Sequence, residues 1–213
     1  MKEASYVAIE GVIGVGKTSL ARILSETFGA HLLLEKVEEN PFLKDFYKDR
    51  KRYAFQTQMF FLFSRYQQQR EYAQRNVFYQ RTVSDYIFQK DRIFANMNLS
   101  DQELALYERV APILEEGIPN PDLVIYLQAS TDILMERIHK RGRTFEHEIT
   151  RDYIEALNDA YNYYFFHYTE TPLLVVATSE IDFVANPKHL ADLVARIQGH
   201  ESGTTYYTPA GIL

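Results

Sequence analysis

The 213-residue sequence predicts an α/β domain of three layers, in which helices cover both faces of a parallel sheet. Three observations lead to this prediction. Short apolar runs alternate with long helical patterns, and a glycine-rich phosphate-binding motif follows the first run. The composition, 46% hydrophobic and 24% charged, is typical of an ordinary folded domain and excludes a disordered chain.

The apolar runs have the length and character of strands buried on both faces, as in a parallel sheet. We expect strands at Tyr6–Glu10, His31–Leu34, Thr82–Ser84, Leu123–Leu127 and Leu173–Ala177. One domain is expected over residues 1–199. The tail at 200–213 contains Gly, Ser, Thr and Pro without periodicity, which predicts loose order.

Helical patterns separate these strands. Ser19–Phe28 continues as a helix from the glycine-rich motif, and Ser100 with Glu103 reads as a capping box that starts another. Ala54–Tyr72 and Thr150–Tyr168 are long enough for four or more turns.

Composition also excludes several classes of protein. With 29 acidic and 23 basic side chains, the net charge of −6 argues against a nucleic-acid polymer as partner. Cysteine is absent, which rules out disulfides and thiolate catalysis. The apolar runs are far shorter than the ~20 residues of a membrane span, and no signal peptide is seen. A cytoplasmic protein without a membrane partner is therefore expected.

The segment Gly11–Thr18 matches the phosphate-binding loop pattern G-x-x-x-x-G-K-[ST] between a strand and a helix. Backbone N–H groups of such a loop hold a phosphate at a helix N-terminus. Lys17 would neutralise phosphate charge and the Thr18 hydroxyl would ligate Mg²⁺. The ATP-binding residues predicted from this loop are Gly11, Gly14, Val15, Gly16, Lys17, Thr18 and Ser19.

A phosphate-binding loop alone does not distinguish kinases from GTPases or ATPases. The sequence has no N-K-x-D-like guanine motif, and no run of four apolar residues ending in Asp that is typical of motor and transport ATPases. Small-metabolite kinases need, besides the loop, an acid near the acceptor hydroxyl and a mobile Arg-rich lid.

Two carboxylates follow predicted strands, at the sheet edge where ligands of open parallel sheets bind. Glu35 could take a proton from an attacking hydroxyl, and Asp85 could hold Mg²⁺ directly or through water. The alternative for each is an ordinary surface acid beside a strand.

Four strong cations lie within seven positions at Arg137–Arg143, which we call the lid segment. Arg137 and Arg141 share a helix face, and Gly142 would end that helix. Such a cluster suits a polyphosphate, whose charge it would stabilise during transfer. The alternative is a solvated helix end that is favourable to the helix dipole.

Five ordered blocks resemble the deoxynucleoside kinase family, and most closely its bacterial deoxyadenosine/deoxyguanosine kinase branch. They are GVIGVGKTS, LLEKVEENPF, FQTQMFFLFSRY, VSDYIFQKDRIFA and RIHKRGRTFEHEI, and the resemblance covers roughly residues 5 to 197. It implies a phosphate-binding-loop fold with a five-stranded parallel sheet of order 2-3-1-4-5 and an Arg-rich lid. It also implies a homodimer that uses Mg²⁺ and ATP.

The resemblance also implies roles for individual residues. Glu35 resembles the general base that acts on the 5′-hydroxyl of the deoxyribose. On the nucleoside side, Gln58 would read the base edge, Arg65 would pair with Asp91 beside the base, and Phe94 would pack on it. Tyr47 and Glu146 would hold the sugar 3′-hydroxyl. Arg137, Arg141 and Arg143 match the lid arginines around the donor phosphates, and catalysis is assigned to Glu35, Lys17, Arg137 and Arg141.

Some of these side chains have alternative interpretations. Gln58 resembles the nearby Gln56 and Gln67–Gln69, so it could be a solvated helix residue. Phe94 and Tyr47 could be ordinary core residues in a chain with 14 Phe and 16 Tyr.

The sequence departs from the family at the end of the third strand. Many relatives carry Glu-Arg-Ser or Asp-Arg-Ser there, whereas this chain has Asp85-Tyr86-Ile87. The acid is retained, so Mg²⁺ binding is expected. The cation that replaces the missing Arg near Glu35 is left open, as is the place of Arg81.

The leading hypothesis is ATP-dependent phosphorylation of the 5′-hydroxyl of a deoxynucleoside to a 5′-monophosphate, in nucleotide salvage. A purine is favoured on branch resemblance, with deoxycytidine as an alternative. A nucleoside monophosphate kinase such as thymidylate kinase is a second hypothesis, but Glu35 and Glu146 would repel an acceptor phosphate. A non-catalytic nucleotide-binding subunit is a third, and the presence of Glu35, Lys17 and the lid argues against it.

Overall fold

The computed structural model describes residues 5–75, 80–179 and 181–208. Its centre is one parallel sheet of order β2-β3-β1-β4-β5-β6. The strands are β1 (Tyr6–Gly11), β2 (His31–Leu33), β3 (Thr82–Ser84), β4 (Leu123–Gln128), β5 (Leu173–Ala177) and β6 (Thr204–Tyr207).

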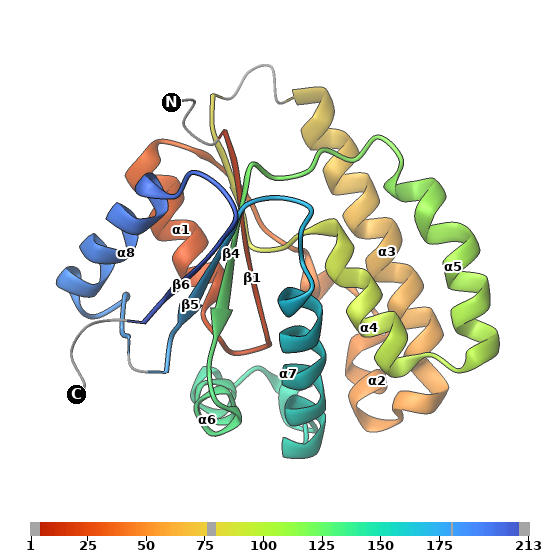
Figure 1. The fold of residues 1–213 in the computed structure, drawn as a ribbon. Helices are drawn as coiled ribbons and strands as arrows, with labels where there is room; N and C mark the ends of the chain where they lie inside the picture. The colour runs from red at the N-terminus through yellow and green to blue at the C-terminus, as the bar shows by residue number, and fades with distance from the viewer. Residues whose placement is uncertain (1–4, 76–79, 180, 209–213) are drawn as a thin grey trace.

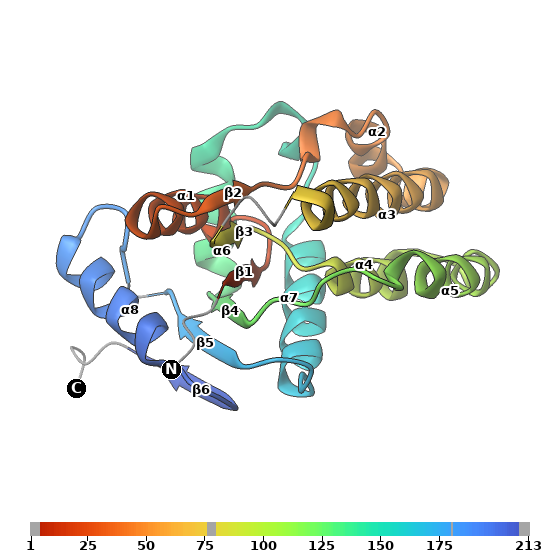
Figure 2. The same ribbon diagram turned by 90° about the horizontal axis from the view of Figure 1, so that it is seen from above.

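Helices cover both faces of the sheet, as predicted. Figures 1 and 2 show α1 and α8 on one face and α3, α4, α5 and α7 on the other. The α-helices are α1 (Lys17–Phe28), α2 (Leu43–Lys48), α3 (Arg50–Arg75), α4 (Asp91–Asn98), α5 (Asp101–Glu115), α6 (Thr131–Arg141), α7 (Arg151–Phe166) and α8 (Pro187–Gly199). Within the described residues, short 3₁₀ turns lie at Val37–Glu39, Phe88–Lys90 and Thr144–Glu146.

The prediction of five strands is wrong by one. The sixth strand, β6, comes from the tail that was expected to be loosely ordered, and it pairs in parallel with β5 from Leu173↔Thr204 to Val176↔Tyr207. Only Tyr207 of this strand is buried, because β6 is an edge strand with a solvated face. The remainder of the predicted tail, 209–213, lies outside the described residues.

The other predicted elements lie where the sequence indicated, with ends shifted by a few residues. Strands β3 and β5 have the predicted bounds, and the capping box between Ser100 and Glu103 forms at the start of α5. The helix predicted at Ala54–Tyr72 is longer at both ends, as α3. Within the described ranges, no helix is both long and apolar enough to cross a membrane.

The core lies between the central strands and the helices on either side. Strands β1 and β4 are buried almost throughout, so their apolar side chains pack against α1 on one face and α7 on the other. Ile9, Val124, Ile125 and Leu157 have no exposed surface. This packing holds the carboxyl ends of β1, β2 and β3 side by side, because these strands are neighbours in the sheet.

Candidate active site

The phosphate-binding loop joins β1 to α1, and its glycines allow two close approaches. A Cβ atom on Gly11 would lie 2.5 Å from the backbone oxygen of Leu127 on β4. A Cβ atom on Gly14, whose φ is +88°, would lie 2.9 Å from the backbone oxygen of Leu134 on α6. Glycine at these positions therefore lets the loop pack closely between the sheet and the helix that carries the lid segment.

Lys17 lies at the first turn of α1 and folds back over the loop. Its Nζ donates to the backbone oxygens of Gly11, at 2.6 Å, and Val12, at 3.2 Å. Burial, together with repulsion from the ammonium group of Lys90, lowers the pKa of Lys17 to about 8. A phosphate group that displaced the carbonyl contacts would stabilise the charged form of this side chain.

Asp85 connects the three neighbouring strand ends. It follows β3, and its Oδ2 accepts a hydrogen bond of 2.6 Å from the Thr18 hydroxyl. Its Oδ1 accepts a hydrogen bond of 2.8 Å from the backbone N–H of Glu35, which lies two residues after the end of β2. One buried carboxylate thus fixes the start of α1 and the backbone of Glu35 relative to each other.

The same residues provide a donor set that fits Mg²⁺. This ion prefers oxygen ligands and usually takes one or two from the protein, with phosphate and water supplying the rest. Thr18 and Asp85 contribute a hydroxyl and a carboxylate oxygen 2.6 Å apart beside the phosphate-binding loop. The predicted metal ligands are therefore adjacent, and their role as ligands stays a prediction.

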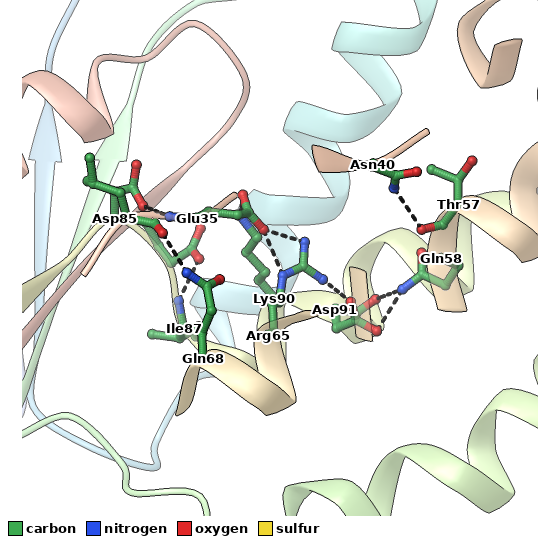
Figure 3. A network of polar contacts seen from close by, with 12 residues as sticks. Glu35, Asn40, Thr57, Gln58, Arg65, Gln68, Asp85, Ile87, Lys90 and Asp91 are labelled. Carbon is green, nitrogen blue, oxygen red and sulfur yellow. Dashed lines mark hydrogen bonds and ion pairs between the residues drawn. The ribbon is translucent and has the colours of Figure 1, made fainter. Parts of the chain in front are cut away.

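The Glu35 carboxylate lies between two cations from different elements (Figure 3). Its Oε1 is 2.7 Å from Nε and 2.6 Å from Nη2 of Arg65 on α3, and its Oε2 is 2.7 Å from Nζ of Lys90. Burial alone would raise the pKa of Glu35, but Arg65 and Lys90 outweigh burial and lower it to about 2. Glu35 is therefore a carboxylate at neutral pH.

Lys90 and Arg65 answer the question of which cation accompanies Glu35. The predicted family Arg position is Tyr86, whose buried ring lies 5.9 Å from Nζ of Lys90. Arg81 precedes β3, at the opposite end of the strand from Asp85, and so does not supply this charge.

Arg65 also joins the acidic site to the predicted base-reading residues (Figure 3). Its Nη1 contacts Oδ1 of Asp91, and Nε2 of Gln58 donates to Oδ2 and to the backbone oxygen of Asp91 at 2.7 and 2.9 Å. The pairing predicted between Arg65 and Asp91 is confirmed. Gln58 is buried, so the alternative of a solvated helix residue is wrong.

A first pocket runs along these side chains. The residues that line it include Glu35, Lys90, Arg65, Thr18, Asp85, Gln58 and Phe94. Tyr47 on α2 and Glu146, which follows the lid segment, line the same pocket. The ring of Phe94 meets the ring of Tyr161 edge to face, with centroids 6.1 Å apart. Phe94 and Tyr47 are thus both partly buried in the core and part of the pocket wall.

Two of the lid arginines, Arg141 and Arg143, are paired with acids. Arg141 donates to both carboxylate oxygens of Glu146, at 2.6 and 3.1 Å, and Arg143 lies 3.6 Å from Glu38 and 3.8 Å from Glu146. Gly142, with φ of +66°, ends α6 as predicted. Glu146, which is predicted to hold the sugar, therefore contacts Arg141 and Arg143, which are predicted to hold phosphate.

A second pocket adjoins the first and shares with it Gly14, Lys17, Thr18, Arg141 and Arg143. Arg137 borders it and ties two elements together, since its guanidinium donates to the backbone oxygens of Val15, at 3.1 Å, and Thr178, at 3.0 Å. The two pockets meet at the phosphate-binding loop, so a donor phosphate in one would face an acceptor in the other.

Several residues of this region are absent from the sequence-based prediction. Lys90 is one, and Glu10 on β1 is another, a fully buried acid whose oxygens accept from the backbone N–H groups of Gly11 and Ile87. A charged residue within an apolar strand was the available signal for Glu10. The second pocket is also lined by Arg22, Lys140, Ser179, Ile181, Asp182, Phe183 and Val184.

Comparison with known proteins agrees with this geometry. A model of the deoxynucleoside kinase family matches residues 7–201. The chain belongs to the deoxynucleoside kinase family. It is 38% identical to a deoxyguanosine kinase of Bacillus subtilis over 93% of this chain and 98% of that protein. It is 33% identical to a deoxyadenosine kinase of Dictyostelium discoideum over 90% and 78% of the two chains.

Solved structures give the same result. A deoxyadenosine kinase from M. mycoides with bound dATP superposes with a TM-score of 0.77 at 27% identity, covering 91% of this chain and 98% of that one. The same kinase with bound dCTP gives 0.76 at 28% identity, over 90% and 98% of the chains. The resemblance, the fold class and the enzyme class predicted from the sequence are confirmed: the protein is a deoxynucleoside kinase.

The pKa values of Glu10 and Glu35 should be shifted in opposite directions. Burial raises the pKa of Glu10 above its ordinary value of 4.5, whereas Arg65 and Lys90 hold that of Glu35 near 2. We therefore expect carboxyl ¹³C NMR at pH 4 to show Glu35 ionised and Glu10 protonated. Because the folded-state pKa of Glu35 is depressed, its contribution to stability is present above about pH 4.5 and is lost as the pH falls towards 2. A Glu35 resonance that titrated above pH 4 would contradict this assignment.

Proposed function

We propose that the protein transfers the terminal phosphoryl group of ATP to the 5′-hydroxyl of a deoxynucleoside, with a purine favoured. The observation that carries this proposal is that two pockets share Lys17 and Thr18, and that Glu35 lines one of them. The acceptor would lie in the first pocket and ATP in the second. A role in nucleotide salvage and a cytoplasmic location are part of the same proposal.

In this reaction the acceptor O–H bond breaks and its proton passes to Glu35. The hydroxyl oxygen forms a bond to the terminal phosphorus while the bond from phosphorus to the ADP oxygen breaks. Phosphoryl transfer of this kind depends mainly on positioning and on stabilisation of charge. A carboxylate with a pKa of about 2 is a weak base, but it is sufficient to orient the hydroxyl and accept its proton. A loose transition state requires mainly positioning and little help from a strong base.

Charge on the transferred group would be stabilised by the phosphate-binding loop and the lid segment. Lys17, Arg141 and Arg143 line both pockets, and Arg137 lines the second. Thr18 and Asp85 would hold Mg²⁺, which would supply further neutralisation of phosphate charge. To reach the phosphates, Arg141 would exchange part of its pairing with Glu146 for the donor, which leaves Glu146 for the sugar 3′-hydroxyl beside Tyr47.

The orientation of the Gln58 amide would allow it to read the edge of a base. Both groups that its Nε2 contacts, Oδ2 and the backbone oxygen of Asp91, are acceptors, which fixes the nitrogen on that side. Within the described residues Oε1 is left to accept from a base N–H. Adenine, guanine and cytosine each offer one, so the preference for a purine relies on the B. subtilis and D. discoideum relatives, whose names specify deoxyguanosine and deoxyadenosine.

Incubation with Mg-ATP and a panel of acceptors tests the proposed function. We expect 5′-monophosphates from deoxynucleosides, with deoxyguanosine or deoxyadenosine consumed first in a competition of the four. Phosphorylation of monophosphates alone, as by a thymidylate kinase, would contradict the proposal. So would ATP binding without turnover of any acceptor, the behaviour of a non-catalytic subunit.

Substitution of Glu35 tests the identity of the base. In Glu35→Gln we expect kcat to fall by ~10²- to 10⁴-fold while the deoxynucleoside still binds, because proton transfer is lost and the side-chain shape is retained. Steady-state kinetics and calorimetric titration measure the two effects. Glu155→Gln is the matched control, since that side chain is exposed on α7. An unchanged kcat in Glu35→Gln would move the role to Glu38 or Glu39.

We also infer that two copies associate through the outer face of α5. Leu106 and Ile113 are seven residues apart, hence on one side of this helix, and are 50% and 71% exposed. Light scattering should give the mass of a dimer for the wild type and of a monomer for Leu106→Glu/Ile113→Glu. A wild-type monomer, or a double variant that remains dimeric, would contradict this interface.

A further inference from the structure

The two oxygens of Glu35 are not equivalent. Oε1 is contacted by both Nε and Nη2 of Arg65, at 2.7 and 2.6 Å, whereas Oε2 is contacted by Nζ of Lys90 alone, at 2.7 Å. A carboxylate offers about four lone-pair sites, two on each oxygen. Arg65 therefore fills those of Oε1, and Lys90 fills one of the two on Oε2.

Lys90 is held in place by its surroundings. Its side chain is 4% exposed and lines the acceptor pocket. The 3₁₀ turn Phe88–Lys90 that carries it begins beside Ile87, whose N–H donates to the buried Glu10 at 2.8 Å. The Tyr86 ring lies 5.9 Å from Nζ. Because the Lys90 side chain is enclosed, its Nζ has little freedom to move, and its position constrains the orientation of the Glu35 carboxylate.

Burial of a charged lysine is costly, and a well-packed apolar residue is often as stabilising as a buried ion pair. Arg65 is shared between Glu35 and Asp91 and contacts only Oε1 of Glu35, so Lys90 supplies the second positive charge that these two carboxylates need. Lys90 adds something that Arg65 does not, which is a fixed hydrogen-bond direction on the second oxygen.

We propose that Lys90 is the positioning residue of the proton acceptor: it orients Oε2 of Glu35 so that the remaining lone pair of this atom faces the acceptor hydroxyl. This inference rests on the proposed function. The O–H bond of the acceptor breaks, its proton goes to Oε2, and the hydroxyl oxygen forms its bond to the terminal phosphorus as the bond to ADP breaks. Lys90 exchanges no proton and touches no substrate.

The test compares Lys90→Met with Lys90→Arg, which keeps a cationic donor, and with Lys188→Met, an exposed control on α8. In Lys90→Met we expect kcat to fall by ~10- to 100-fold, because a misplacement of about 1 Å can cost that much. The calorimetric Kd for the deoxynucleoside should change by less than about threefold, because Arg65, Asp91 and Gln58 are untouched. Lys90→Arg should recover part of the loss, and Lys188→Met should match the wild type.

A double-mutant cycle separates positioning from a merely structural role. If Lys90 acts through Glu35, Lys90→Met should lower kcat by less than about twofold in a Glu35→Gln background, measured in single turnover. An additive loss would overturn the assignment, as would an undiminished kcat in Lys90→Met or an equal loss of nucleoside binding. A wild type that phosphorylates no deoxynucleoside would instead contradict the proposed function and, with it, this inference.

Discussion

The guanidinium of Arg65 is the contact on which the site depends. It lies between the carboxylates of Glu35 and Asp91, which come from different parts of the chain and are both nearly buried. Loss of one partner from such a buried group leaves an uncompensated charge, at a cost of about 3–5 kcal/mol. Glu35 lies at one end of this chain of contacts, and Gln58, held by Asp91, lies at the other. In the proposed reaction, a single side chain of α3 would therefore set the distance between the proton acceptor and the residue that reads the base.

The parallel sheet explains how these charges come to lie together. Strands β2, β3 and β1 are neighbours, and Glu35, Asp85 and the phosphate-binding loop all follow their carboxyl ends. The protein is acidic overall, with a net charge of −6, but Lys17, Lys90, Arg65 and the lid segment place positive charge around this edge. The net charge of the whole chain therefore says nothing against the binding of one nucleotide in a pocket.

Much of the fold was predictable because buried parallel strands leave long apolar runs, and five of them were located within a residue or so at each end. The sixth, β6, was missed because an edge strand needs only one buried side chain, Tyr207, and TTYY beside Gly and Ser reads as a tail. The phosphate-binding loop, Glu35 and Asp85 follow from motif and topology. Lys90 does not, because a lysine next to Asp and Arg in the sequence is ordinarily a solvated residue, and only the tertiary structure encloses it.

The strand order has a consequence for how the chain folds during synthesis. Strand β1 lies at the centre of the sheet, and its longer pairing is with β4. Residues 6–11 therefore cannot form this pairing until residues 123–128 have been synthesised. In that interval β1 can pair only with β3, over three residues, and the edge of β1 that pairs with β4 stays unpaired. Parallel pairing across such a sequence separation is slow, and an unpaired apolar edge favours aggregation. The pairing of β1 with β4 is therefore the step on which the rest of the sheet depends, since β5 and β6 lie beyond β4.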